Sequence, residues 1–81
     1  MRTHAICGQM LRSEAVALLK ELDAQYLIKP SMVLVEQRKP DSYELRLKGF
    51  YNLELIKGFT KKYNLECEED LTKGYLCIFT P

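Results

Sequence analysis

The sequence has few of the features that would name a reaction. Its 81 residues include one histidine, which leaves no Ser-His-Asp set, and its four glycines form no phosphate-binding loop. Twelve Lys and Arg against eleven Asp and Glu give a net charge of +1, which exerts no long-range attraction on nucleic acid or acidic membranes. No apolar run is long enough for a membrane span or a signal peptide core. We therefore expect a cytosolic protein that does not bind membranes.

The cysteines are odd in number and have no paired spacing. Three of them describe no disulfide framework, and they suit a reducing compartment. His4, Cys7, Cys67 and Cys77 are four possible zinc ligands, but residues three apart on a strand point to opposite faces. We therefore expect no metal and no cofactor, with Cys67 and Cys77 serving as small apolar side chains.

The composition is that of an ordinary soluble globular domain, with 47% hydrophobic and 28% charged residues. At this length we expect one domain over residues 1–81. Its core should be thin, because so short a chain buries only about 60% of its unfolded surface. A partner could therefore contribute to its stability.

Residues 32–49 predict a β-hairpin, because two extended runs flank a Pro-Asp turn. Apolar and charged residues alternate strictly over residues 43–48, so Leu45 and Leu47 point inward. An odd loop would set Val33 and Val35 opposite Leu47 and Leu45, whereas an even loop would bury a glutamate without a partner. We favour the odd loop, which turns seven residues outward: Met32, Leu34, Glu36, Arg38, Glu44, Arg46 and Lys48.

Two segments have the apolar spacing of helices. In the first, Ser13 is the expected N-cap and Pro30 requires an end near Leu27 or Ile28. In the second, Asn52 is the expected N-cap, and Asn64 can end the helix in a left-handed conformation while Leu65 folds back.

Strands complete the pattern at residues 3–7 and 74–80, and the acidic residues 66–70 are expected to form a connector. The resulting order is strand, helix, strand, strand, helix, strand. This is an α+β fold, the ferredoxin-like βαββαβ sandwich, whose antiparallel sheet carries two helices on one face.

In that fold the second and fourth strands are the edges of the sheet. Both are apolar here, although edge strands of monomers normally carry charges or proline. We therefore expect a small non-catalytic binding or accessory module, which forms a homodimer or a complex with another protein. Its contacts would come from the edge strands and the open sheet face, through Met32, Leu34, Tyr75, Cys77 and Phe79.

RNA binding is the alternative function. Lys48-Gly49-Phe50-Tyr51 resembles the start of the RNP1 motif of RNA-recognition modules, which share this topology. Those modules display stacking aromatics on central strands, whereas the outward side of residues 43–48 is charged, and we expect Phe50 and Tyr51 to pack instead. Phosphate contacts would come from Arg38, Lys39, Arg46 and Lys48.

Thiol chemistry at Cys7 is the third possibility. A thiol in a strand-to-helix turn near a helix N-terminus has a lowered pKa and more thiolate. The layout resembles that of small bacterial sulfur-carrier proteins, in which a reactive cysteine precedes the first helix. The likeness covers about the first quarter of the chain, and Cys7-Gly8-Gln9-Met10 lacks the prolines that follow the cysteine in that family.

Overall fold

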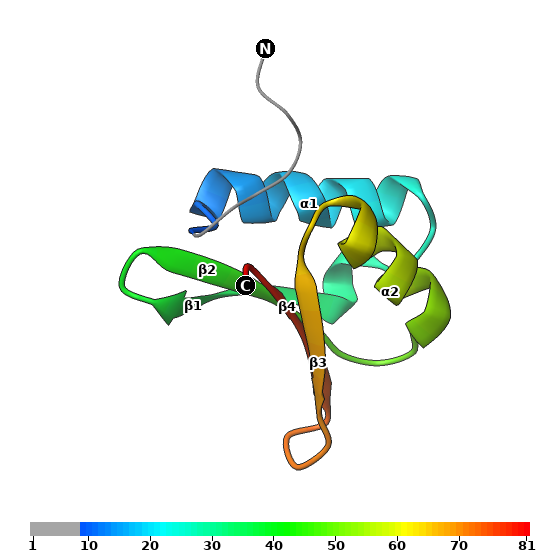
Figure 1. Ribbon diagram of the computed structural model, residues 1–81. Coiled ribbons are helices and arrows are strands. Elements are labelled where there is room, and N and C mark those ends of the chain that lie inside the picture. The colour runs from blue at the N-terminus through cyan, green and yellow to red at the C-terminus, as the bar shows by residue number, and fades with distance from the viewer. Residues whose placement is uncertain (1–8) are drawn as a thin grey trace.

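The computed structural model describes residues 9–81, in which two helices lie on one side of a four-stranded antiparallel sheet (Figure 1). The fold is therefore α+β, as expected, and its strand order, β1-β2-β4-β3, is compatible with a ferredoxin-like arrangement. The expected strand at residues 3–7 lies outside the described residues. In chain order the elements are α1 (Arg12–Ala24), the short 3-10 helix η1 (Pro30–Met32), β1 (Val33–Lys39), β2 (Ser42–Leu47), α2 (Leu53–Lys62), β3 (Glu66–Asp70) and β4 (Tyr75–Phe79).

The register of the β1–β2 hairpin agrees with the prediction. Val33 pairs with Leu47 and Val35 with Leu45, so the alternating residues of β2 face as expected. The turn itself has two residues, and the odd residue is instead absorbed by a register shift between Gln37 and Lys39. The bulge thus reconciles a short turn with the burial pattern of both strands.

The acidic segment 66–70 is a strand and not the connector expected from the sequence. As β3, it pairs along its whole length with β4, from Glu66 opposite Phe79 to Asp70 opposite Tyr75. Its turn is closed at Asp70, whose carboxylate accepts from the Lys73 N–H at 3.0 Å, and at Gly74, which has a positive φ of 77°. Charged residues suit this strand because it is an edge of the sheet, where charge opposes pairing with other chains.

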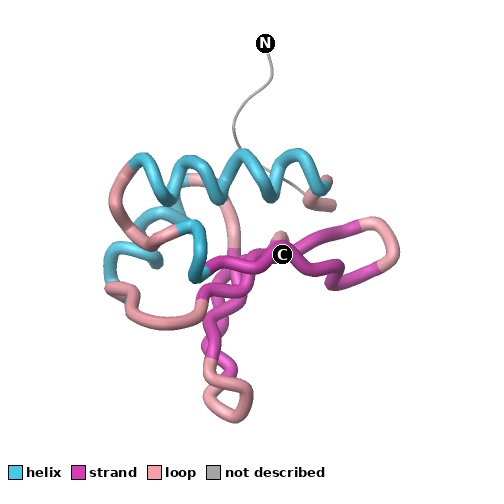
Figure 2. The backbone as a smooth tube through the Cα atoms, turned by 180° about the vertical axis from the view of Figure 1, so that it is seen from behind, coloured by secondary structure: helices cyan, strands magenta, loops and turns pink. Residues whose placement is uncertain are grey.

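This extra strand changes which strands are the edges. β4 is hydrogen-bonded to β2 on one side and to β3 on the other, so it is a central strand, and β1 and β3 are the edges. Figure 2 shows the consequence from behind, where the two hairpins extend from the twisted sheet in different directions.

The helix ends are defined by backbone and side-chain caps. Ser13 is not the N-cap of α1, because Leu11 occupies that position and its N–H donates to Glu14 Oε1 at 2.8 Å. The carboxylate of Glu14 thus accepts from the backbone N–H of the N-cap residue, as the N3 glutamate of a capping box does. α2 begins as predicted, with Asn52 Oδ1 accepting from the Leu55 N–H at 3.2 Å.

The core lies between the two helices and the sheet. Met10 joins it because its backbone N–H donates to Ser42 Oγ and its carbonyl accepts from the Tyr43 N–H, both at 2.9 Å. No helix in residues 9–81 is long and apolar enough to cross a membrane. The buried apolar core is Met10, Ala15, Leu18, Leu22, Ile28, Val33, Leu45, Leu47, Ile56, Phe59, Leu65, Leu76 and Ile78.

Candidate protein-interaction surface

The open face of the sheet, the side opposite the helices, is organised around Glu44. Only 3% of this residue is exposed. Its carboxylate accepts from Arg38 Nη1 at 2.9 Å and from Arg46 Nε at 2.6 Å. The hydrogen bond to Glu44 raises the pKa of Arg46 above its ordinary value. The buried charge of Glu44 is thus compensated by two arginines.

The same arginines cover the aromatic residues of β4. The Arg38 guanidinium carbon lies 3.8 Å from the centroid of the Phe79 ring, and that of Arg46 lies 5.1 Å from the Tyr75 centroid. Tyr75 is therefore 9% exposed and Cys77 8% exposed. Burial raises the pKa of the Cys77 thiol, and the neighbouring charge of Glu44 adds to the effect.

These contacts correct the interface expected along the final strand. Tyr75, Cys77 and Phe79 face away from the helices as predicted, but arginine side chains lie over both rings, Tyr75 and Cys77 are buried, and Phe79 is half-buried. Because β4 is a central strand, its backbone has no free edge for a second strand. The prediction that the final strand is an edge of the sheet is therefore wrong.

The basic residues considered for RNA binding are divided by the same network. Arg38 and Arg46 are bound to Glu44, whereas Lys39 and Lys48 are exposed and contribute no ion pair within residues 9–81. A shallow hollow of about 470 Å³ on this face mixes both signs of charge. Its charged lining consists of Arg38, Lys39, Arg46, Lys73, Glu44, Glu68 and Asp70.

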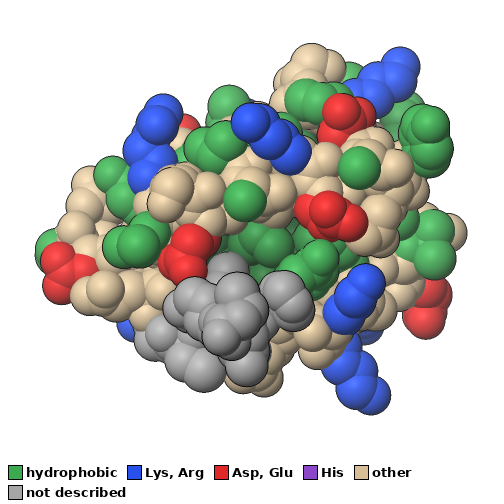
Figure 3. Space-filling view, turned by 90° about the horizontal axis from the view of Figure 1, so that it is seen from above, with side chains coloured by type: hydrophobic (Ala, Val, Ile, Leu, Met, Phe, Trp, Pro, Cys, Tyr) green, Lys and Arg blue, Asp and Glu red, His purple; other side chains and the backbone are tan. Residues whose placement is uncertain are grey.

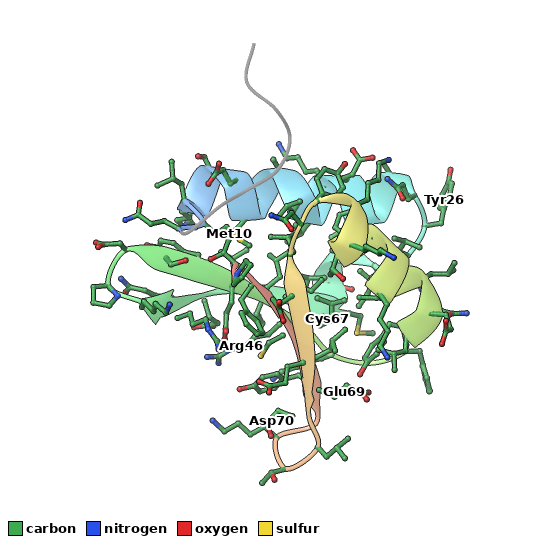
Figure 4. All side chains as sticks on the ribbon, viewed as in Figure 1. Met10, Tyr26, Arg46, Cys67, Glu69 and Asp70 are labelled. Atoms are coloured by element: carbon green, nitrogen blue, oxygen red, sulfur yellow. The ribbon has the colours of Figure 1, made fainter. Side chains whose placement is uncertain are left out.

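A second surface forms where α1 ends. The Tyr26 N–H donates to the Asp23 carbonyl at 3.0 Å and the Leu27 N–H to the Leu22 carbonyl at 2.9 Å, which is the hydrogen-bond pattern of a Schellman cap. Tyr26 therefore occupies the left-handed position, with a φ of 58°. Figure 4 shows its side chain at the end of α1, directed away from the rest of the fold.

The neighbouring wall of this surface comes from two loops that approach each other closely. The Lys48 N–H donates to the Met32 carbonyl at 2.7 Å. Gly49 has a φ of 81°, and a Cβ atom there would lie 2.9 Å from Met32 Sδ, so only glycine fits without displacing Met32. The chain then continues into Phe50, whose side chain is exposed to solvent.

Together these segments surround an apolar hollow of about 420 Å³. Tyr26 is 93% exposed and Phe50 98% exposed, the highest fractions among the large apolar residues of the described chain. Elsewhere, as Figure 3 shows from the side of α1, hydrophobic side chains are interspersed with charges of both signs. We call this surface the Tyr26 corner; it is lined by Asp23, Tyr26, Leu27, Ile28, Lys29, Met32 and Phe50.

The corner contains only one of the five residues expected to bind a partner. Met32 belongs to it, and Leu34 is exposed on the neighbouring edge strand β1. Phe50 and Tyr51 were both expected to pack; Tyr51 does so, half-buried against the core, whereas Phe50 is exposed. Tyr26 was not predicted as an exposed residue, because an apolar residue four positions after Leu22 continues a helical pattern. Cys7 and His4 lie outside the described residues.

The described residues also include side chains of the types that bind metals. Within residues 9–81 no group of three or more His, Cys, Asp or Glu could hold a metal ion. Comparison of the chain with protein-family models, with curated proteins and with solved structures finds no match in any of the three.

Proposed function

We propose that this protein is a small non-catalytic binding module that holds a protein partner at the Tyr26 corner. The observation that carries the proposal is the near-complete exposure of two aromatic side chains, Tyr26 and Phe50, around one apolar hollow. Aromatic residues are enriched in the buried centres of protein interfaces, where a few of them supply most of the binding energy.

Burial of the exposed rings in an interface would contribute a large favourable hydrophobic free energy. Covering one such ring removes roughly 150 to 250 Å² from water, and at about 25 cal/mol per Å² this favours binding by roughly 4 to 6 kcal/mol before the entropic costs of association. A partner that inserts an apolar side chain into the hollow would cover both rings at once. Neither ring has a cation stacked on it among residues 9–81, in contrast to Phe79 and Tyr75.

The backbone at Tyr26 supports a functional role for the side chain. A left-handed conformation disfavours residues other than glycine, asparagine and aspartate by about 1 kcal/mol or more. Tyr26 accepts this conformation while leaving its ring in water. The backbone that carries the ring is held in place, because the next residues, Leu27 and Ile28, turn back onto the core. An aromatic side chain has only two χ angles, so it loses little conformational entropy when a partner binds.

Photo-crosslinking from the corner tests the proposal. A photoreactive phenylalanine analogue replaces Phe50, and in a matched control it replaces Leu71, which is 85% exposed in the β3–β4 turn. On irradiation in extract of the source cells, the probe at position 50 should give discrete protein adducts that the probe at position 71 does not. Tyr26→Gly in the probe-bearing chain should remove them. Equal labelling from both positions would contradict the proposal.

We also propose that the protein works in a reducing compartment such as the cytosol. Cys67 lies on the helix side of β3, 3.9 Å from Thr60 Oγ1, whereas Cys77 lies on the open face of β4. Two thiols on opposite faces of a sheet have no route to a mutual disulfide without unfolding. Titration of thiols in protein isolated from the source cells under acid quench should find all three cysteines free.

A further inference from the structure

We propose that the partner at the Tyr26 corner is a second copy of this chain, bound about a two-fold axis that passes close to Tyr26. This inference rests on the proposed function and specifies the partner. In such an isologous interface one patch meets an identical patch in reversed orientation, so the patch must be complementary to itself.

The charges of the corner meet this requirement. Asp23 and Lys29 both line the hollow, one three residues before Tyr26 and the other three residues after it. Both are exposed, and neither forms an ion pair within residues 9–81. A two-fold axis that runs between Asp23 and Lys29 sets Asp23 of each copy opposite Lys29 of the other copy. A partner of different sequence would need the same pair of opposite charges, whereas a second copy provides it automatically.

The apolar parts of the corner include both projecting rings and a hollow. Each copy offers two projecting rings, Tyr26 and Phe50, and beside them a hollow of about 420 Å³. Two-fold symmetry gives each hollow a ring from the other copy, which leaves no projecting ring unmatched. Tyr26, nearest to the axis, would meet its own counterpart.

The area available is consistent with a dimer of moderate affinity. A specific interface covers at least about 600 Å² on each partner, and the two rings alone supply about 300 to 500 Å². The remainder can come from the exposed part of Met32, from Leu27 and from the aliphatic stem of Lys29, all of which line the hollow. The dimer should therefore dissociate on dilution.

Charge exchange across the axis tests this arrangement. The mass of the wild-type chain, followed by sedimentation from low to high micromolar concentration, should rise from monomer to dimer. Asp23→Lys and Lys29→Asp, each made alone, place like charges opposite each other twice and should raise the dissociation constant about tenfold or more. An equimolar mixture of the two variants should form a heterodimer, because every cation then faces an anion. Asp41→Lys, in the distant β1–β2 turn, is the charge-matched control and should dimerise normally.

The outcomes separate this inference from the proposed function. A wild-type chain that stays monomeric, or a dimer that Asp23→Lys, Lys29→Asp and their mixture leave unchanged, would overturn the second-copy proposal. If crosslinking from position 50 then still labels another protein and depends on Tyr26, the binding function stands with a different partner. If neither dimer nor specific adduct forms, both proposals fail. Circular dichroism of each variant checks that the charge changes leave the fold intact.

Discussion

The open face of the sheet and the Tyr26 corner each contain two aromatic rings, but only on the open face do other side chains of residues 9–81 lie over the rings. On the open face, Arg38 and Arg46 are drawn across Phe79 and Tyr75 because both bind the buried carboxylate of Glu44. At the corner the charged residues stand at the rim and the rings remain bare. The difference shows that composition alone does not decide whether an aromatic surface is available. An aromatic surface is covered where a carboxylate, here that of Glu44, holds arginine side chains over its rings.

The largest expected effect concerns the core on which both surfaces depend. Leu45 is fully buried on β2, opposite Val35 and Ile78. Leu45→Ala should lower the free energy of unfolding by about 2 to 5 kcal/mol, because it removes buried apolar contacts and leaves a cavity. Urea unfolding followed by circular dichroism measures the change. Leu34→Ala, at an exposed position of β1, is the control and should cost less than about 0.5 kcal/mol. Equal costs would contradict the register.

Removal of the Glu44 carboxylate should expose the aromatic rings of the open face, as the rings of the corner are exposed. Glu44→Ala removes two charge-assisted hydrogen bonds, but both arginines are partly exposed and can recover hydration, so the expected loss of unfolding free energy is about 2 kcal/mol. The arginines should also move off the rings of Tyr75 and Phe79, which would increase binding of a hydrophobic dye. Glu44→Gln keeps the shape and should retain part of the cover. If Glu44→Ala changes neither stability nor dye binding, the arginines are not held by this carboxylate.

The two surfaces also differ in how far the sequence predicts them. Alternation along residues 43–48 identified the outward position of Glu44 and the inward position of Leu45, because a strand with one wet face repeats every two residues. It could not identify β4 as a central strand, because that position depends on pairing with β3, whose acidic sequence has low strand propensity. The recognisable signal was its turn, since Asp70 and Gly74 are typical closing residues of a hairpin loop.

The helix ends give the same lesson on a smaller scale. Both helices end with one residue in the left-handed conformation, Asn64 after α2 and Tyr26 after α1. Asn64 was predicted because asparagine tolerates this conformation, and Leu65 folds back as expected. Tyr26 was not, because tyrosine has no such preference, so the site that carries the proposed function departs from the local rule.

Replacing both residues by glycine sharpens that contrast. Tyr26→Gly should raise the free energy of unfolding by about 0.5 to 1 kcal/mol, because it relieves a disfavoured backbone conformation and removes an exposed ring that contributes little to the core. Asn64→Gly should change it by only a few tenths of a kcal/mol, because asparagine already tolerates this conformation. Thermal and urea unfolding at a concentration where the chain is monomeric measure both. A Tyr26→Gly variant that is clearly less stable would mean that the ring supports the fold.

The smallest expected effect separates the neighbours Phe50 and Tyr51. Tyr51 donates its hydroxyl hydrogen to Glu69 Oε2 at 2.9 Å, a contact that ties the start of α2 to β3, while Phe50 has no such anchor. Burial, followed by the bond to Glu69, raises the pKa of Tyr51 above its ordinary value of 10.0. A group whose pKa is higher in the folded state stabilises the fold below its unfolded pKa and loses that contribution as the pH rises through its folded pKa. Tyr51→Phe should therefore lower the free energy of unfolding by about 0.5 kcal/mol at neutral pH, and this deficit should shrink above a pH of about 10.

Urea unfolding of wild type and variant at neutral and alkaline pH measures the difference. Tyr63→Phe, whose hydroxyl has no hydrogen bond within residues 9–81, serves as the control. A deficit that stays constant with pH would show that the Tyr51 hydroxyl does not hold this loop through Glu69.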